Sequence, residues 1–262
     1  MAIDNARMHR QTLEALRVRD EFLSTASHEL RTPVTSILLV VQSLVRGFRE
    51  GQVSIAPRML SLANQQVTRL ATLIDQLLDV SRIQTGQLQL QLVLEDFDLV
   101  ADVQQLLGRM QMQMEQARSP VRFHTHETSL VGRWDRSRID QLLTNLLSNA
   151  FTYGAGEPID LLLERAVTDG GVASSDRARI TVRDRGIGIA ADRLPYIFDR
   201  FERGTSTRHY GGLGLGLFIA RQIVLAHCGT VSVESEPNRG SSFTVELPLK
   251  PPVAREPQTN GH

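Results

Sequence analysis

The hydrophobic pattern divides the chain into a helical first third and a mixed remainder. From about Ala6 to Gly47, apolar residues recur three and four positions apart, as in one amphipathic helix interrupted only by Pro33. A polar turn over 47–56 leads to a second such helix, which starts near Pro57, a favourable first-turn residue. Two long helices joined by a short turn predict an antiparallel hairpin.

The second helix carries an apolar stripe that has two possible explanations. The stripe consists of Leu60, Ala63, Val67, Leu70, Ile74, Leu77 and Ser81, widened by Leu73 and Leu78. Two helices bury little surface by themselves, so we expect the hairpin to pair with a second copy and form a four-helix bundle. Packing within one chain explains the same stripe, and the sequence leaves this alternative open.

Strand and helix patterns are mixed from residue 87 onward. The expected elements are a strand over 88–94, a helix over 99–117, strands over 121–126 and 129–132, a helix over 136–153, strands over 159–164 and 179–183, a helix over 215–227 and a hairpin of 230–235 with 241–247. Because strands and helices do not alternate regularly, we expect a two-layer α+β sandwich. The polar, proline-rich residues 251–262 are expected to form a disordered tail.

Composition and charge exclude several classes of protein. The 29 Lys and Arg balance the 29 Asp and Glu, so nothing indicates a nucleic-acid partner. The single Cys228 excludes a disulfide framework and a multi-cysteine metal site. With no signal peptide and no apolar run near the ~18 residues of a transmembrane segment, we expect a soluble cytoplasmic protein. Lys250 is the only lysine, which excludes P-loop enzymes and eukaryotic-type protein kinases, because both need a lysine at the phosphates.

The segment 24–37 places a histidine, a carboxylate and a proline on one helix. His28 lies about 200° round the helix from the apolar residues two positions either side, so we expect it to face solvent. A solvent-facing imidazole is mostly uncharged at neutral pH and can act as a nucleophile, and Glu29 can hydrogen-bond one ring nitrogen. Thr32 lies one turn further on the same face. Taken alone, these residues are also explained as a solvated helix face.

Two motifs of the second domain suit the recognition of a nucleotide. Asn145 and Asn149, four residues apart on a helix, face the same way and suit Mg²⁺, a hard cation that prefers oxygen ligands. Asp184, Gly186 and Gly188 follow a strand directly. Glycines at such a place let the backbone approach a flat ligand, and a carboxylate can accept a hydrogen bond from an exocyclic amine.

Two further motifs surround a polar, glycine-rich stretch. Phe198–Phe201 opens this stretch, which we expect to be a mobile lid over residues 200–211. The glycine run from Gly211 to Gly216 leads into a helix, whose N-terminal amides can bind phosphate. Each of the four motifs is weak alone, because such sequences are often only turns or close-packed loops. Their order and spacing make coincidence a poor explanation.

In this order, the motifs resemble the transmitter core of bacterial two-component sensor histidine kinases. The matching segments are Ser27–Pro33 for the phosphoacceptor box, Asn145–Asn149 for the N box, Asp184–Gly188 for the first glycine box, Phe198–Phe201 for the F box and Gly212–Gly216 for the second glycine box. The resemblance implies a dimerisation hairpin and an ATP-binding sandwich of the fold shared with gyrase, Hsp90 chaperones and MutL. The implied division is a signalling or linker helix (1–22), a dimerisation and phosphotransfer domain (23–84), a catalytic ATP-binding domain (87–250) and a tail (251–262).

The resemblance also implies roles for individual residues. His28 would take the γ-phosphoryl group of ATP with Glu29 as general base, and Thr32 would position the water that hydrolyses the aspartyl phosphate of a response regulator. Asn145 would ligate Mg²⁺, and Asp184 would bind the adenine amino group. The other implied nucleotide-binding residues are Asn149, Tyr153, Gly186, Gly188, Arg203, Gly212, Gly214 and Gly216.

One departure from the family pattern concerns phosphate binding. Thr152 stands where the family often has a basic residue, so neutralisation of the phosphates would fall more on Mg²⁺ and on Arg203 or Arg208. At the N-terminus, Ala2–Met8 resembles the helix that leaves a GAF-type sensor domain, although an ordinary charged helix start explains it too. The signal is then expected from a sensor domain or protein outside this chain.

The predicted function is autophosphorylation of His28 by ATP in a homodimer. Transfer to an aspartate of a response regulator receiver domain would follow, with phosphatase activity toward that domain. One alternative is a degenerate, ATP-binding dimeric scaffold, against which the intact His28, Glu29, Asn145 and Asp184 argue. Another is a different ATPase of the same fold, against which the phosphoacceptor box argues.

Overall fold

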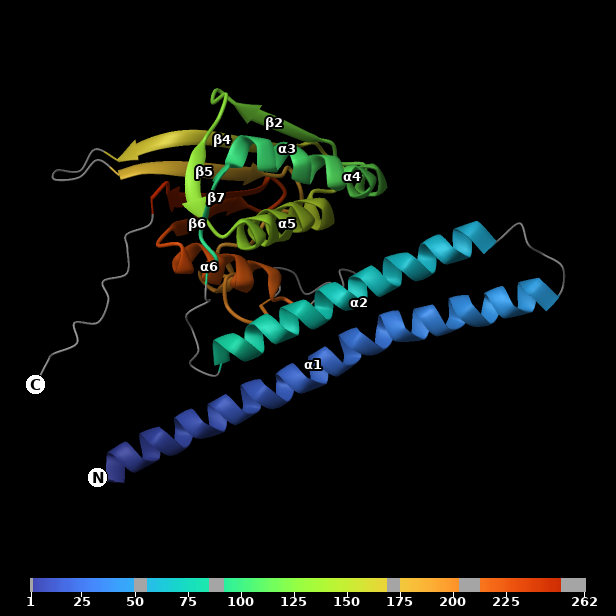
Figure 1. Cartoon of the computed structure of the whole chain (residues 1–262). Coiled ribbons are helices and arrows are strands. Elements are labelled where there is room, and N and C mark those ends of the chain that lie inside the picture. Colours follow the sequence, from blue (N-terminus) through green and yellow to red (C-terminus); the bar gives the residue numbers. More distant parts are fainter. Residues whose placement is uncertain (1, 50–55, 85–91, 169–174, 203–212, 251–262) are drawn as a thin grey trace, which may run out of the picture. The chain divides into compact units, whose positions relative to one another are not determined.

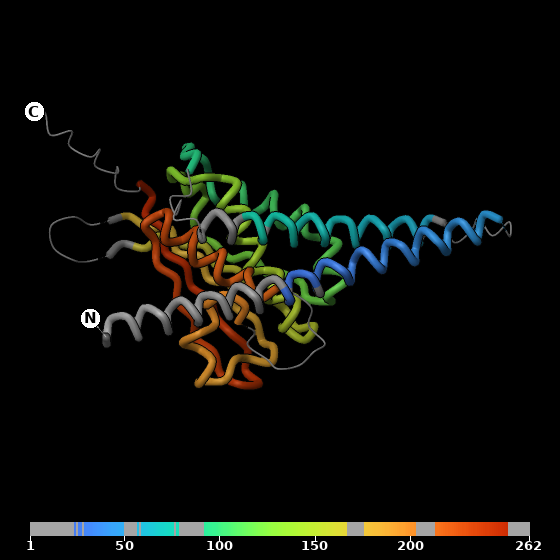
Figure 2. The backbone as a smooth tube through the Cα atoms, turned by 90° about the horizontal axis from the view of Figure 1, so that it is seen from below, coloured from blue at the N-terminus to red at the C-terminus, as the bar shows by residue number. Residues whose placement is uncertain are grey.

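The computed structural model describes residues 2–49, 56–84, 92–168, 175–202 and 213–250. It divides into a helical unit, mainly residues 1–85, and a mixed α/β unit built from most of the rest. In the helical unit, α1 (Ala2–Arg49) and α2 (Ala56–Gln84) run antiparallel as a hairpin (Figures 1 and 2). None of the helices within these described ranges is long and apolar enough to cross a membrane.

The apolar stripe of the hairpin is only partly covered within one chain. Leu73 is buried, as is Ala26 on α1. In contrast, Leu60, Val67 and Ile74 of the predicted stripe are 59%, 50% and 44% exposed. Packing within one chain therefore does not account for these three positions. Their exposure at heptad spacing favours a second copy as the partner of the stripe.

The mixed unit is a two-layer α+β sandwich, as the sequence predicts. Its elements are β1 (Glu95–Asp98), α3 (Leu99–Arg109), α4 (Gln111–Ala117), β2 (Val121–Thr125), β3 (Val131–Trp134), α5 (Arg136–Tyr153), β4 (Ile159–Thr168), β5 (Ser175–Arg183), a 3₁₀ helix (Leu194–Tyr196), α6 (Gly216–Ala226), β6 (Thr230–Glu236) and β7 (Gly240–Pro248). Five strands form a sheet in the order β2-β4-β5-β7-β6, and β1 pairs separately with β3. Helices α5 and α6 contact each other and pack on the sheet (Figure 1).

Three differences from the predicted elements lie between residues 88 and 134, and β4 and β5 are also longer than expected, reaching Thr168 and beginning at Ser175. The expected strand over 88–94 is not found at 92–94, and its earlier residues lie outside the described ranges. Strand β1 begins at Glu95 instead and ends at Asp98, whose carboxylate accepts hydrogen bonds from the backbone N–H of Val100 (3.0 Å) and of Leu130 (2.9 Å). Because the N–H of Leu130 is used in this way, β3 starts at residue 131 rather than at 129.

The third difference is a break in the predicted helix over 99–117. Met110 separates α3 from α4, and its backbone N–H bonds the carbonyls of both Leu106 and Leu107. Met110 is also buried. The apolar periodicity therefore continues through the break, which is why the sequence pattern does not reveal it.

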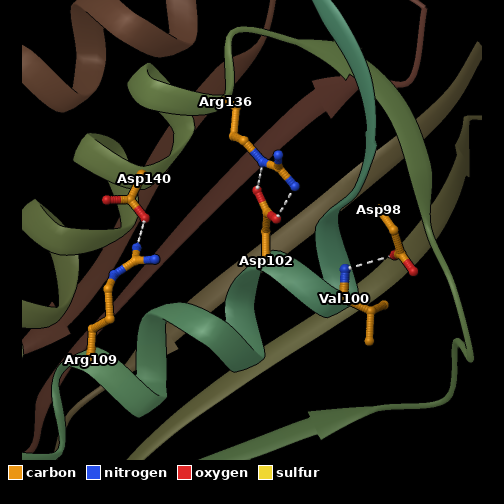
Figure 3. A network of polar contacts seen from close by, with 6 residues as sticks. All are labelled: Asp98, Val100, Asp102, Arg109, Arg136 and Asp140. Carbon is orange, nitrogen blue, oxygen red and sulfur yellow. Dashed lines mark hydrogen bonds and ion pairs between the residues drawn. The ribbon is translucent and has the colours of Figure 1, made fainter.

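Ion pairs connect α3 with α5 (Figure 3). Arg136 donates two hydrogen bonds to Asp102, at 2.8 and 2.7 Å, and its guanidinium lies 5.3 Å from the centre of the Phe97 ring. Arg109 pairs with Asp140 one turn further along α5. Exposed pairs of this kind contribute little free energy, because water and salt screen them. They lie on the surface where α3 faces the first turns of α5.

A buried histidine connects the C-terminus of α6 with the N-terminus of α5. His227 is 0% exposed. Its Nε2 accepts a hydrogen bond from the backbone N–H of Asp135 (3.0 Å), so the proton of the neutral ring lies on Nδ1, which donates to the carbonyl of Ile223 (2.8 Å). Asp135 in turn caps α5, accepting from the N–H of Arg138. Burial lowers the pKa of His227, although the bond to Ile223 opposes this effect.

We predict that His227 makes the free energy of unfolding depend on pH. Above the unfolded-state pKa of 6.5 the imidazole is neutral in both states. Below it, the unfolded chain binds a proton that the folded chain does not, so the stability falls as the pH falls. A His227→Gln variant should be less stable at pH 7.5 by about 1–3 kcal/mol. Its free energy of unfolding should also fall less between pH 7 and 5 than that of the wild-type protein. Urea unfolding followed by fluorescence of the buried Trp134 measures both effects.

The matched control is His126→Gln, because the side chain of His126 is exposed. This variant should keep the pH dependence of the wild-type protein. Equal slopes for the wild type and His227→Gln would show that His227 does not titrate on unfolding.

Candidate functional site

Asp184 is the only acidic residue among the site residues predicted in the mixed unit, and it is buried. It lies directly after β5, and its Oδ1 accepts hydrogen bonds from the backbone N–H of Gly186 (2.9 Å) and of Ser241 (3.3 Å). Burial raises the pKa of Asp184 above its usual value, and the two backbone hydrogen bonds oppose that rise. Within the described residues no donor reaches Oδ2, which leaves one carboxylate oxygen for a ligand.

The loop after Asp184 is pressed against the end of α5. A Cβ on Gly186 would lie 1.8 Å from the carbonyl oxygen of Tyr153, the last residue of α5. The same carbonyl accepts a hydrogen bond from the N–H of Ile187 (3.2 Å). Only glycine permits this approach. The close approach therefore places the first glycine box directly beside the end of the helix that carries the two asparagines.

The other side of the loop is pressed against the turn between β6 and β7. Gly188 has a φ of +65°, and a Cβ there would lie 1.9 Å from the carbonyl oxygen of Glu236. The turn itself closes through a hydrogen bond from the backbone N–H of Arg239 to the backbone carbonyl of Glu236 (3.0 Å), and Asn238 within it has a φ of +63°. Asn238 also donates its N–H to the carbonyl of Ile187 (2.7 Å). The loop is thus held between α5 and the β6–β7 turn.

The side chain of Asn145 on α5 lies beside the start of α6. Asn145 and Asn149 are half-buried on a helix whose other face is made of buried leucines. A Cβ on Gly216, the first residue of α6, would lie 3.7 Å from Oδ1 of Asn145. The amide nitrogen Nδ2 of Asn145 is buried and has no hydrogen-bond partner among the described residues. A buried donor without a partner is costly, so a ligand oxygen is the natural acceptor.

The second glycine box contacts the F box. Phe201 and Gly214 both have positive φ, at 65° and 67°, and the N–H of Phe201 donates to the carbonyl of Gly214 (3.1 Å). The guanidinium of Arg200 lies 4.9 Å from the centre of the Phe218 ring on α6. The predicted lid residues 203–211 lie outside the described ranges, as do Arg203, Arg208 and Gly212 among the predicted site residues.

Thr152, the departure from the family pattern, is exposed near the end of α5. Its hydroxyl donates to the carbonyl of Ser148 on the same helix (2.8 Å). The side chain therefore satisfies its donor locally and supplies no positive charge to a phosphate. The neighbouring Tyr153, half-buried, lies beside the first glycine box as described above.

The phosphoacceptor segment lies within α1 of the helical unit. The backbone of His28 is helical, but its side chain is outside the described part of the chain, so the solvent exposure of the imidazole stays a prediction. Glu29 is largely buried, and its Oε2 lies 3.6 Å from a guanidinium nitrogen of Arg69 on α2. Thr32 is exposed, and Pro33 is buried on the same helix.

Two residues of the site were not predicted from the sequence. The backbone of Ser241 exchanges hydrogen bonds with Asp184, accepting from its N–H at 2.9 Å. Gly240, at a φ of +90°, approaches so closely that a Cβ would lie 2.1 Å from the carbonyl oxygen of Asp184. The only local signal was a glycine followed by two serines at the start of β7. Their importance depends on the pairing of β7 with β5, which that signal does not show.

These features fit an adenine nucleotide. The unused oxygen of Asp184 can accept from an exocyclic amine, and the glycine positions keep side chains away from the backbone near it. The unpartnered Nδ2 of Asn145 can donate to a phosphate oxygen. Among the described residues, no three His, Cys, Asp or Glu side chains gather to hold a metal ion. The side-chain oxygen of Asn145 is of the type that Mg²⁺ accepts together with nucleotide phosphates.

Comparison with known families agrees with both units. Residues 134–251 match the "Histidine kinase-, DNA gyrase B-, and HSP90-like ATPase" family, and residues 18–86 match the "His Kinase A (phospho-acceptor) domain". The fold and site thus define an ATP-binding domain of this class. Because the phosphoacceptor domain precedes it on the same chain, the chain belongs to the two-component sensor histidine kinases and forms their transmitter core.

Individual relatives support this assignment. The chain is 33% identical over 237 residues to a sensor protein kinase WalK of Staphylococcus saprophyticus, covering 89% of this chain and 37% of the relative. It resembles the histidine kinase AdeS of Acinetobacter baumannii, which is 27% identical, with a TM-score of 0.58 over 85% of this chain and 98% of that chain. It shares the fold of the histidine kinase ThkA solved in complex with the response regulator TrrA, which is 23% identical, with a TM-score of 0.59 over 94% and 66% of the two chains.

We predict that Gly186→Ala strongly weakens nucleotide binding. The added methyl would meet the Tyr153 carbonyl at 1.8 Å, so the loop that carries Asp184 must move away from α5. The dissociation constant for a non-hydrolysable ATP analogue should rise by more than about tenfold, as measured by titration calorimetry.

Gly108→Ala is the matched control, because nothing lies within 4 Å of a Cβ there. This glycine lies within α3, so alanine should stabilise the protein by about 0.5–1 kcal/mol without changing the affinity. Wild-type affinity in Gly186→Ala would mean that the close approach is not needed for binding.

Proposed function

We propose that this chain uses ATP to phosphorylate His28 and then passes the phosphoryl group to an aspartate of a response regulator. The proposal is carried by two groups of the mixed unit. Asp184 is a buried residue whose Oδ1 is bonded to backbone amides while Oδ2 receives no donor from the described residues, and Asn145 has a buried amide nitrogen without a partner among them. Both lie on elements joined through Gly186. The phosphoacceptor segment on the same chain supplies the group to be phosphorylated.

In the proposed reaction, the recognition of ATP is divided among the elements of the mixed unit. Asp184 accepts from the adenine amine, while Asn145 and Asn149 hold the phosphates from α5. Mg²⁺, held at Asn145, would neutralise charge on the phosphates as they react. Tyr153, Gly186 and Gly188 shape the base-binding end, and Gly212, Gly214 and Gly216 shape the phosphate end. Arg203 would add positive charge, which Thr152 does not supply.

The proposed phosphoryl transfer is a displacement at the γ-phosphorus. A neutral ring nitrogen of His28 forms the new N–P bond while the bond to the β,γ-bridging oxygen breaks, and ADP leaves. Glu29, as general base, takes the proton from the other ring nitrogen. A guanidinium nitrogen of Arg69 on α2 lies 3.6 Å from Oε2 of this carboxylate, so Glu29 lies on the side of α1 that faces α2.

The proposed partners are a second copy of the chain and a receiver domain. The exposed apolar positions of the hairpin support the dimer, and light scattering should give twice the chain mass of 29.2 kDa. The ThkA complex offers a precedent for the response regulator in a protein of the same fold. The chain spans 37% of the length of its WalK relative. The proposed source of the signal is a sensor domain or protein outside these residues.

We predict that His28 is the only phosphorylated residue. The chain incubated with γ-labelled ATP and Mg²⁺ should gain an acid-labile, base-stable label, and His28→Ala should remove it. Removal of free Mg²⁺ with EDTA should also prevent labelling. The control His126→Ala replaces an exposed histidine and should label as the wild type does.

Two results of the labelling experiment would contradict the proposal in different ways. Undiminished label on His28→Ala would move the phosphorylation site elsewhere. An unlabelled wild-type chain that still binds ATP would favour the alternative function, a degenerate ATP-binding scaffold. The one observation that favours this alternative is the locally bonded, uncharged Thr152.

We also predict that Thr32→Ala separates the kinase and phosphatase activities. Thr32 is exposed one turn after His28, where its hydroxyl can orient a water without contacting ATP. Autophosphorylation should persist, and dephosphorylation of the response regulator should be lost. Thr35→Ala is the control, because this exposed threonine lies about two turns after His28 rather than one. If Thr32→Ala loses both activities, Thr32 serves the helix around Pro33 instead.

A further inference from the structure

The hydroxyl of Ser235 lies where three backbone segments of the site meet. Ser235 is on β6, directly opposite Ser241 of β7. Its Oγ accepts a hydrogen bond from the N–H of Ile189 (2.8 Å) and donates to the carbonyl of Gly240 (2.8 Å). It also lies 3.0 Å from Oγ of Ser241. One half-buried side chain therefore joins the first glycine box to both sides of the β6–β7 turn.

Counting protons fixes the direction of these bonds. A serine hydroxyl has one proton to donate and two lone pairs that can accept. Ser235 donates its proton to the carbonyl of Gly240, so Ser241 must be the donor in the bond between the two hydroxyls. The proton of Ser241 is thereby committed to Ser235. What Ser241 can still offer to a ligand is an acceptor lone pair.

The position of Ile189 shows what the first of these bonds holds. Ile189 follows Gly188, whose backbone is pressed on the carbonyl of Glu236. One residue earlier, the carbonyl of Ile187 accepts from Asn238 of the β6–β7 turn (2.7 Å). The hydrogen bond from the N–H of Ile189 to Ser235 Oγ attaches the same loop to the same turn, but through a side chain. Without it, the end of the loop that begins at Asp184 would lose one of its fixed points.

We propose that Ser235 is a positioning residue for the adenine base. It holds the first glycine box on the β6–β7 turn, and it orients the Ser241 hydroxyl as an acceptor beside the carboxylate of Asp184, which the N–H of Ser241 contacts at 3.3 Å. Two acceptors match the exocyclic amine of adenine. The same two acceptors would repel the carbonyl oxygen that guanine carries at this ring position, because neither side has a proton to donate. This inference rests on the proposed ATP binding and adds a determinant of base selectivity to it.

The test compares the full chain with Ser235→Ala for binding of non-hydrolysable ATP and GTP analogues. The variant should bind the ATP analogue about tenfold more weakly and discriminate less against the GTP analogue, because one or two hydrogen bonds are lost. Autophosphorylation should show a raised KM for ATP with an unchanged kcat. Hydrogen exchange at the Ile189 amide should become faster, because this N–H loses its acceptor. Ser232→Ala, on the exposed face of the same strand, should change none of these values.

A second pair of variants keeps the test valid if Ser235→Ala folds poorly. Threonine and valine have the same shape, but only threonine keeps the hydroxyl. Ser235→Thr should bind the ATP analogue within about twofold of the wild type, and Ser235→Val should resemble the alanine variant. Equal affinities of Ser235→Thr and Ser235→Val would overturn this inference, as would wild-type affinity and selectivity in Ser235→Ala. Neither result would contradict the proposed function. A wild-type chain that binds neither analogue would contradict the proposed function as well.

Discussion

The contact between the α-carbon of Gly186 and the carbonyl oxygen of Tyr153 determines how the parts of the ATP-binding unit can be arranged. It joins the loop after β5 to the end of α5 at a distance that leaves no room for a methyl group. At its other end, the same 18-residue helix is capped by Asp135, whose backbone N–H is held by His227 from α6. Helix α5 is thus fixed at both ends. The positions of Asn145 and Asn149 along this helix therefore follow from how its two ends are held.

Much of this arrangement could be predicted from local sequence. The bounds of α5 are correct because a capping aspartate precedes the helix and Gly154 follows it. Asp184 and Gly186 were expected beside each other after a strand, and the structure places both at the end of α5, the helix that carries Asn145. In contrast, the break at Met110 was missed because the buried methionine continues the apolar period. Ser235 and Ser241 were missed because their roles arise from strand register, which joins residues distant in the chain and is invisible in a short motif.

The hairpin illustrates an ambiguity that sequence alone does not resolve. Heptad spacing predicts a buried stripe, but it does not say whether one chain or two chains cover it. In the structure Leu73 is buried while Leu60 and Val67 remain exposed, which favours the case of two chains. The phosphoacceptor segment lies within the first of these helices, where Pro33 removes one backbone donor. The helical unit therefore combines a surface suited to pairing with the segment that carries His28.

The orientation of Asp184 is set by main-chain amides, those of Gly186 and Ser241, rather than by other side chains. Amides of this kind are present whatever residue occupies a position, proline excepted. Substitutions around the carboxylate can therefore accumulate without turning it, provided that the backbone keeps its path. An attempt to redesign this unit for a different base would therefore start from three features. They are Asp184 itself, the hydroxyls of Ser235 and Ser241 beside it, and the length of the loop that follows Asp184.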